Sequence, residues 1–248
     1  MRKRVRRGAW VTLIILAAAA CFGYILRDGR DSGRAYEFLA VDSAAAPPPL
    51  RTIVVDAGHG GLDGGAVSPG GRSESAYNLE IALKTELFLR FLGMPSVMTR
   101  REDISLHDGE QGTIRQKKNA DLRNRAARVN STDGAVLLSI HQNMFSDPRY
   151  SGAQVFYNGR TESKALAQTM QNALRACIDP DNRRQPGPVD TLLMNEARCP
   201  AILVECGFLS NTAEEALLRD PIYQTKLAMV MSITVTDWVI STENQTNN

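Results

Sequence analysis

The chain has 248 residues, with 29 Lys or Arg, 27 Asp or Glu and a formal net charge of +2. This length allows one mid-sized domain, and 43% hydrophobic with 6% aromatic residues is ordinary for a globular α/β protein. Residues 1–50 hold eight basic and four acidic residues, so residues 51–248 carry a balance of −2. A slightly acidic body lacks the basic surface of a nucleic-acid-binding protein, so we expect no nucleic-acid partner.

The basic excess lies at the N-terminus, directly before an apolar segment. Five Arg or Lys residues within 2–7 are followed by residues 8–26, which carry no charge. As a helix, this segment spans roughly 28 Å, close to the hydrocarbon thickness of a bilayer. The positive charges favour a cytoplasmic N-terminus and export of the rest. We predict an uncleaved membrane anchor, with a signal peptide cleaved after Ala17–Ala20 as the alternative, and an extracytoplasmic body in both cases.

Residues 27–50 separate this segment from the body and end near three consecutive prolines, Pro47–Pro49. Proline favours extended polyproline geometry and has no amide hydrogen, so we predict a linker. Residues 51–240 are predicted to form one catalytic domain, and the polar residues 241–248 a flexible tail.

The four cysteines are too few for a disulfide scaffold. Cys21 lies in the apolar segment, which leaves Cys177, Cys199 and Cys206 in the body. No Cys-x-x-Cys pair occurs, which argues against a thiolate zinc site. We interpret the three as small buried hydrophobic residues, with a Cys199–Cys206 bridge left open.

The body alternates short apolar runs with segments of helical spacing. In chain order, strands are predicted at 52–56, 95–99, 135–140, 153–157 and 201–205, and helices at 77–91, 121–130, 163–177, 213–218 and 222–240. This alternation predicts a single α/β domain, a twisted and mostly parallel sheet with helices on both faces. The carboxyl ends of parallel strands converge on one crevice, where we expect the functional site.

Polar side chains lie at those strand ends. His59 follows the first strand and His141 the third, Glu205 ends the last strand, and Glu74 precedes the first long helix. Two imidazoles and a carboxylate suit a catalytic Zn²⁺ with an open fourth position. A second carboxylate at a strand end can act as general base. Ligands this scattered are weaker evidence than two histidines on one helix, so spacing alone leaves the metal site undecided.

Four sequence blocks occur in order, Val55–Gly65 (VDAGHGGLDGG), Glu74–Ala82 (ESAYNLEIA), Ser139–Asn143 (SIHQN) and Val204–Asn211 (VECGFLSN). Together they resemble the zinc-dependent N-acetylmuramoyl-L-alanine amidase family, the type called Amidase_3, from residue 51 to about 240. The resemblance implies one Zn²⁺ per chain, bound by His59, Glu74 and His141, with Glu205 as the catalytic carboxylate. It also implies peptidoglycan as substrate, hydrolysed at the amide bond between N-acetylmuramic acid and L-alanine.

Within this family, the membrane anchor, the single catalytic domain and a long loop at 103–118 resemble the spore-cortex amidases linked to germination. That resemblance implies a Gram-positive spore former, in which peptide removal precedes muramic lactam formation by a partner deacetylase. A vegetative autolysin or cell-separation amidase is the alternative role, and an inactive peptidoglycan-binding module the alternative class. A required protein activator, the preferred stem peptide and the oligomeric state are left open.

Several residues near the blocks have two interpretations each. Asn143 either contacts substrate or makes a strand-end hydrogen bond, and Asp63 either orients a ligand histidine or is a turn residue. Gln142 and Met144 are bulkier than the family pattern and are expected to narrow the cleft, whereas Ser75 and Ala76 replace a charged pair. None of these departures removes a predicted ligand or the predicted base.

The remaining polar residues are assigned supporting roles. Asp121 and Arg125 are predicted to be structural partners, and His107 a solvated loop residue. Arg115, Lys117 and Lys118 are interpreted as a solvated face, with an acidic glycan or peptide group as the alternative ligand. The glycines after the first strand match neither phosphate-binding motif, so no nucleotide site is expected.

Overall fold

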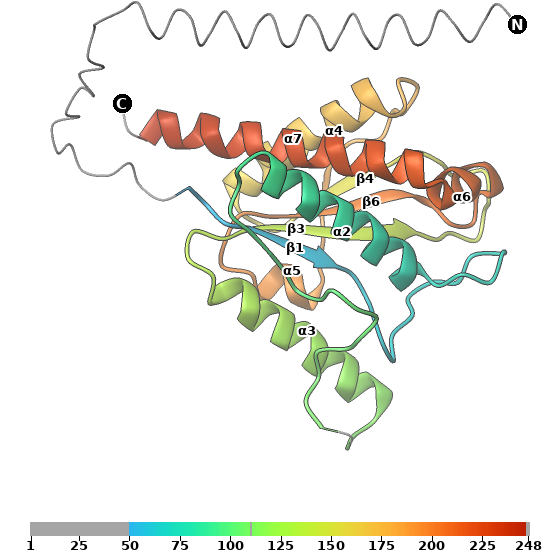
Figure 1. Ribbon diagram of the computed structural model, residues 1–248. Helices are drawn as coiled ribbons and strands as arrows, with labels where there is room; N and C mark the ends of the chain where they lie inside the picture. The colour runs from blue at the N-terminus through green and yellow to red at the C-terminus, as the bar shows by residue number, and fades with distance from the viewer. Residues whose placement is uncertain (1–49, 110, 247–248) are drawn as a thin grey trace, which may run out of the picture. The chain divides into compact units, whose positions relative to one another are not determined.

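The computed structural model describes residues 50–109 and 111–246 (Figure 1). The predicted apolar segment 8–26 and the linker up to residue 49 lie outside the described residues. Within the described ranges, no helix combines the length and hydropathy that crossing a bilayer requires.

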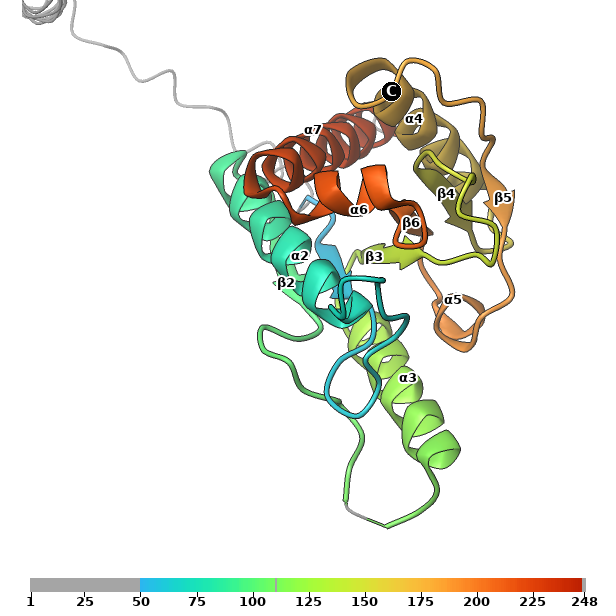
Figure 2. The ribbon, with the colours of Figure 1, turned by 90° about the vertical axis from the view of Figure 1, so that its right-hand side faces the viewer.

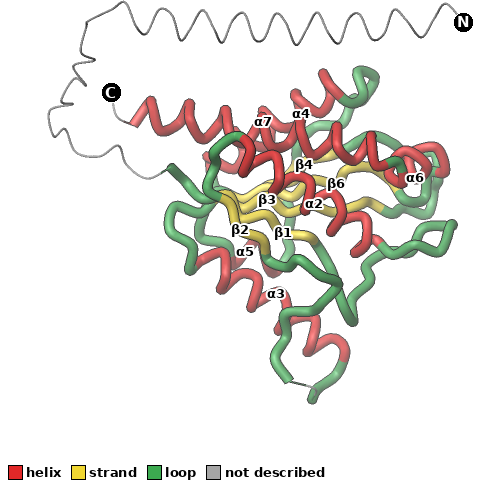
Figure 3. Tube along the Cα trace, in the orientation of Figure 1, coloured by secondary structure: helices red, strands yellow, loops and turns green. Residues whose placement is uncertain are grey.

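The centre of the body is one six-stranded sheet in the order β2-β1-β3-β6-β4-β5 (Figure 3). Its strands are β1 (Ile53–Ala57), β2 (Ser96–Met98), β3 (Val136–Asn143), β4 (Gln154–Tyr157), β5 (Gly187–Pro188) and β6 (Ala201–Phe208). The first four in sheet order run parallel, whereas β4 is antiparallel to β6 and parallel to β5. The predicted mostly parallel α/β fold is confirmed.

Helices cover both faces of the sheet (Figures 1 and 2). One face carries α2 (Glu74–Phe91), α4 (Thr161–Cys177), α6 (Thr212–Arg219) and α7 (Pro221–Thr246). The other carries α3 (Ile114–Asn130) and α5 (Leu192–Glu196). Residues of α3 and α5 line a cavity on this second face, together with Asp56 of β1 and Ser139 of β3.

Two hydrophobic clusters follow from alternation along the strands. Val55 and Leu138 join the larger cluster beneath α2, α4 and α7, whereas their neighbours Val54 and Leu137 join the smaller cluster beneath α3 and α5. Successive strand side chains point to opposite faces, so a strand covered on both sides is apolar throughout. This explains the continuous apolar runs in the sequence.

Helix α3 begins at Ile114 rather than at the predicted residue 121. Thr113 and Gln116 form a capping box, in which the Thr113 side chain accepts from the Gln116 backbone N–H and the Gln116 side chain accepts from Thr113. A Thr-x-x-Gln sequence is a recognised helix start, and it is the signal that could have corrected the prediction. The predicted long loop at 103–118 is therefore shorter, ending at Thr113.

Other differences concern the ends and the short elements. Helix α7 continues to Thr246, so the predicted tail begins inside it, and the Arg51 backbone N–H donates to Glu243 Oε1 over 2.9 Å. The elements β5 and α5 are too short to give a periodic signal. All three body cysteines are free, so Cys199 and Cys206 form no bridge, and Cys177 is exposed rather than buried.

A buried arginine joins α3 to the end of β1. The Arg125 side chain is 1% exposed and donates to Asp56 Oδ1 over 2.7 Å and to Asp121 Oδ2 over 2.7 Å. It also donates to the Ala57 carbonyl at 2.8 Å and the His59 carbonyl at 2.6 Å. The structural roles predicted for Asp121 and Arg125 are confirmed by these contacts.

Burial raises the pKa of Asp56, but the Arg125 charge and hydrogen bonds from Ser139 and Thr99 outweigh it and lower the pKa to about 2. The ionised carboxylate is therefore the form that the fold stabilises. This matters for the site because the same guanidinium holds Asp56 and the backbone of His59.

Arg125→Met is expected to lower the free energy of unfolding by about 3–5 kcal/mol, because removing one partner leaves a buried charge without compensation. Urea unfolding measures this loss. Arg128→Met is the matched control on the same helix, where the exposed residue makes only a 3.4 Å hydrogen bond to the Thr99 carbonyl. The Arg128→Met substitution is expected to lower the free energy of unfolding by no more than about 0.5 kcal/mol. Equal losses in the two variants would contradict the assigned role of Arg125.

The depressed pKa of Asp56 also predicts acid sensitivity. The pKa of Asp56 is 3.8 in the unfolded chain and about 2 in the folded protein. Its contribution to the free energy of unfolding is therefore complete above about pH 4 and is lost as the pH falls toward about 2. At about 1.4 kcal/mol per pKa unit, the contribution is about 2 kcal/mol. The difference in unfolding free energy between wild type and Asp56→Asn should shrink by this amount across that window. A constant difference would show that Asp56 does not titrate there.

Candidate metal and catalytic site

The loop after β1 presents His59 in an unusual backbone conformation. Its φ is 61°, in the left-handed region that few non-glycine residues adopt. Arg125 holds its carbonyl, as described above, and Arg100 donates to the carbonyls of Ala57 at 2.9 Å and Gly58 at 3.0 Å. Two buried guanidinium groups thus fix the turn that positions the imidazole. Sequence reasoning did not single out Arg100.

Two glycines in this loop are required by close approach. A Cβ on Gly58 would lie 2.2 Å from His141 Nε2, inside van der Waals contact. Gly65 has φ +69°, and a Cβ there would lie 2.6 Å from Glu74 Oε2 and 2.7 Å from His59 Cδ2. The glycines let the loop pack directly against the cluster.

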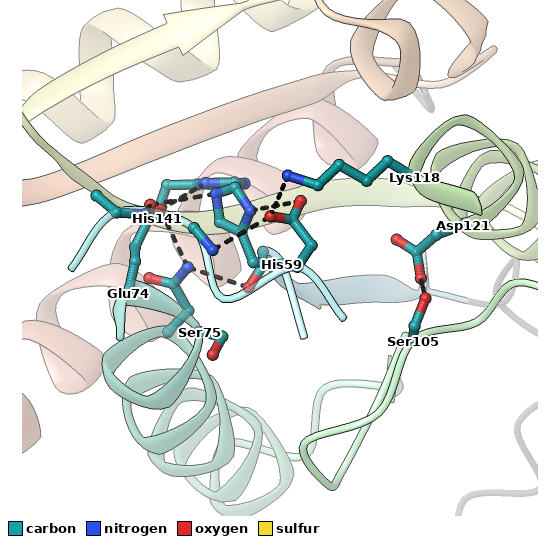
Figure 4. Close-up of polar contacts among 12 residues, drawn as sticks. His59, Glu74, Ser75, Ser105, Lys118, Asp121 and His141 are labelled. Atoms are coloured by element: carbon teal, nitrogen blue, oxygen red, sulfur yellow. Dashed lines mark hydrogen bonds and ion pairs between the residues drawn. The ribbon is translucent and has the colours of Figure 1, made fainter. Parts of the chain in front are cut away.

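His59, Glu74 and His141 meet at the carboxyl end of the parallel strands (Figure 4). His59 Nε2 lies 3.2 Å from Glu74 Oε2, and His141 Nδ1 lies 3.0 Å from Glu74 Oε1. One ligand atom from each residue falls within 4.8 Å of the others, as a shared metal ion requires. This donor set fits Zn²⁺ with an open position.

The charges of the cluster favour a cation. Burial raises the pKa of Glu74, but the two imidazoles lower it well below its usual range. Burial lowers the pKa of His59, yet Glu74 and Asp63 raise it to about 9. The same carboxylates that attract a proton to His59 attract any cation placed among these groups.

Glu205 lies beside the cluster, on the strand next to His141. The two residues are register partners on β6 and β3, so their side chains project from the same face. Glu205 Oε2 is buried and has no hydrogen-bond partner among the described residues. Burial raises the pKa of this carboxyl to about 7, against the opposing effect of the histidines. A carboxylate of this pKa can accept and return a proton near neutral pH.

Asp63 is both a turn residue and a residue that orients a candidate ligand histidine, the two roles considered from the sequence. It lies in the turn, accepting from the Gly65 N–H at 3.2 Å, and its Oδ2 lies 3.0 Å from His59 Nδ1. The latter contact holds His59 Nε2 toward Glu74. Lys118 Nζ lies 2.7 Å from Asp63 Oδ1 (Figure 4), so Lys118 is part of the support for His59 rather than only a solvated residue.

The other predicted residues have different outcomes. Gln142 is buried and donates to Asn78 of α2 at 3.2 Å, so it does not narrow the cleft as expected. Met144 is exposed at the rim. Asn143 makes no side-chain hydrogen bond with a described residue, and its contact with substrate stays a prediction. His107 lies in a loop as predicted, 2.7 Å from the Ser105 hydroxyl.

Asn78 is a supporting residue that sequence reasoning missed. Its Nδ2 atom donates to the Gly58 carbonyl at 3.1 Å and to Glu74 Oε1 at 3.3 Å. It lies one helical turn after Glu74 on α2, and this i,i+4 spacing is the signal that would have found it.

The family model described as N-acetylmuramoyl-L-alanine amidase, Amidase_3, matches residues 53–235. The chain belongs to this family. The amidase is 37% identical over 180 residues to the germination-specific N-acetylmuramoyl-L-alanine amidase of Bacillus subtilis, covering 72% of this chain and 75% of the relative. The chain is accordingly an enzyme that acts on peptidoglycan.

Solved amidase structures share the fold. The CwlD amidase from Clostridioides difficile, solved in complex with the GerS lipoprotein, is 37% identical with a TM-score of 0.74 and covers 77% of this amidase and 99% of that chain. The catalytic domain of CwlV from Bacillus (Paenibacillus) polymyxa is 29% identical with a TM-score of 0.64, covering 76% and 98% respectively. Peptidoglycan lies outside the cytoplasmic membrane, which places the working amidase there.

Asp63→Asn is expected to weaken Zn²⁺ binding about 10-fold or more, since residues that orient a ligand histidine contribute at this level. The asparagine Oδ1 can still accept from Gly65, so the turn is retained. Competition with a chromogenic chelator measures the affinity without any turnover. Asp103→Asn is the control, because Asp103 accepts only from the Gly61 N–H at 3.0 Å and touches no histidine. Unchanged affinity in Asp63→Asn would contradict the orienting role.

Proposed function

We propose that this amidase uses one Zn²⁺, held by His59, Glu74 and His141, with Glu205 as the proton-transferring base. The proposal is carried by one observation, three ligand atoms within 4.8 Å of one another beside a buried carboxylate oxygen without a partner. The donor set, the charge of the cluster and the support from Asp63 all fit the metal. When bound, Zn²⁺ supplies Lewis acidity, which activates water at neutral pH and polarises a carbonyl.

Each residue then has a defined part in hydrolysis of the lactyl–L-alanine amide. Glu205 accepts a proton from the attacking water, because its pKa of about 7 leaves it partly ionised at neutral pH. The protonated Glu205 returns that proton to the departing amine of L-alanine, so one carboxyl group carries out both proton transfers. Asp63 holds the His59 ring in position, and Arg100 and Arg125 keep its backbone from relaxing.

The proposed biological role is spore-cortex maturation and germination. It is supported by 37% identity to a germination-specific amidase and by the likeness to an amidase solved with a lipoprotein. Peptide removal frees the lactyl carboxylate of muramic acid, the group that a deacetylase pathway partner converts into muramic lactam. A protein activator of the lipoprotein kind is proposed as a second partner. A vegetative autolysin remains the alternative role.

The N-terminal segment 8–26 is proposed to hold the enzyme at the outer surface of the membrane, either as an anchor or until its cleavage as a signal. The proposal rests on its uncharged length and on the five preceding basic residues.

Glu205→Gln is expected to keep Zn²⁺ binding and lose about 10²–10⁴-fold in turnover, because the amide cannot accept the proton. Zn²⁺ content by metal analysis and stem-peptide release from purified cortex and vegetative peptidoglycan, followed by mass spectrometry, measure the two effects. His59→Ala is the contrasting variant, expected to lose both metal and activity. Wild-type turnover in Glu205→Gln would exclude Glu205 as the base, and activity unaffected by chelation would exclude the metal.

A further inference from the structure

A second polar feature lies on the same face of the sheet as Glu205. Glu205 is paired with His141 on β3 at one side and with Gln154 on β4 at the other. Paired positions share a face, so Gln154 projects beside the proposed base on the strand away from the metal cluster. The cluster and Gln154 therefore flank Glu205.

The next position of β6 on this face is Phe208. The register with β3 shifts so that Phe208 pairs with Asn143, two residues beyond His141. A Cβ on Gly207 would lie 3.3 Å from Leu218 of α6, so Gly207 faces the opposite side of the sheet. An extra residue of this kind is a β-bulge, and it returns Phe208 to the face of Glu205.

Arg184 spans these two neighbours of Glu205. Its Nη1 donates to Gln154 Oε1 at 3.0 Å, and its guanidinium carbon lies 4.4 Å from the centre of the Phe208 ring. Its Nε also donates to the Ser151 carbonyl at 2.7 Å, and the Tyr150 ring lies 5.7 Å away. With strands about 4.8 Å apart, this places the guanidinium roughly 10 Å from Glu205.

The charge of Arg184 has no carboxylate within ion-pair distance in the part of the chain that the structure describes. The Arg184 charge acts to lower the pKa of Glu214. The two carboxylate oxygens of Glu214, however, accept hydrogen bonds from the backbone N–H groups of Gly152 and Phe208. The adjacent Arg183 differs, because it is exposed and lies 3.7 Å from Asp181. Arg184 Nη2 makes no hydrogen bond with a described residue, so one edge of a stacked and oriented guanidinium is available.

We propose that Arg184 binds a free carboxylate of the peptidoglycan stem peptide and thereby selects the substrate. The inference rests on the proposed function and adds recognition to it. An extended peptide advances at most about 3.5 Å per residue, so a peptide leaving the scissile amide beside Glu205 reaches Arg184 with its second or third residue. The second residue of the stem is a γ-linked glutamate with a free α-carboxylate, which a guanidinium binds in a bidentate manner. Amidation of this carboxylate removes the charge.

The test compares two muramyl peptides that differ only in this carboxylate, free or amidated. The purified Zn²⁺-loaded chain is assayed for kcat/KM on each, by chromatography of the released peptide. Wild type is expected to prefer the free acid by roughly 10-fold or more, the scale of a hydrogen bond to a charged group. Arg184→Gln should bring the ratio of kcat/KM between the free-acid and amidated substrates close to one. Arg184→Lys should keep part of the preference, and the neighbouring Arg183→Gln should leave it unchanged.

The ratio separates recognition from a structural role. If Arg184→Gln lowers kcat/KM equally on both substrates, Arg184 only supports the β4 edge and the inference is overturned. Equal use of both substrates by wild type overturns it too, without any need for a variant to fold, and leaves the amidase function standing. Cleavage of neither substrate by Zn²⁺-loaded wild type, assayed both alone and with the proposed lipoprotein activator, overturns the proposed function, and with it the role of Arg184.

Discussion

The site depends on one buried guanidinium. Arg125 reaches from α3 to the end of β1 and satisfies Asp56, Asp121 and two carbonyls in a region with almost no solvent. One of these carbonyls belongs to His59, whose backbone stands in a strained left-handed conformation. The strain persists because its surroundings determine the loop more strongly than the local preference does. The position of a proposed metal ligand is therefore part of the packing of the fold.

The site contains two carboxyl groups, Glu74 and Glu205, whose pKa values are shifted in opposite directions. Glu74 is shared between two imidazoles and stays ionised despite its burial. Glu205, on the strand next to His141, lacks a hydrogen-bonding partner for its buried Oε2 among the described residues, and burial raises its pKa. Two carboxylates in one cleft are thus separated in proton affinity by their surroundings alone. One is suited to hold a cation, and the other to exchange a proton.

Sequence reasoning succeeded where the signal was local. The apolar runs at 52–56 and 135–140 predicted buried strands, and polar residues at the carboxyl ends of parallel strands meet at one edge of the sheet. Strand β3 continues to Asn143, so His141 lies within it rather than after it. The four blocks identified the candidate ligands for the same reason, since each block is continuous in the chain.

The missed features depend on contacts distant in sequence or on elements too short to show a period. The predicted start of α3 is too late because the polar run 115–119 hides the helical pattern, and only the Thr113 capping box marks the true start. Lys118 was consequently read as solvated, although the corrected helix directs it to Asp63. Arg100 donates to backbone carbonyls across the fold, and Arg184 donates to the Ser151 carbonyl and the Gln154 side chain; no local pattern encodes such contacts.

The antiparallel strand β4 separates the parallel part of the sheet, which holds the candidate site, from the β5 edge. His59 follows β1, His141 lies on β3 and Glu205 on β6, and cores on both faces fix the register of these strands. The remaining candidate ligand, Glu74, is the first residue of α2. The β4–β5 edge carries none of these residues, whereas Gln154 of β4 and its hydrogen-bond partner Arg184 lie there. With Arg184 as the proposed contact to the stem peptide, the residue that selects the substrate and the residues proposed to hold the metal belong to different parts of the sheet, so one set can be substituted without replacing the other.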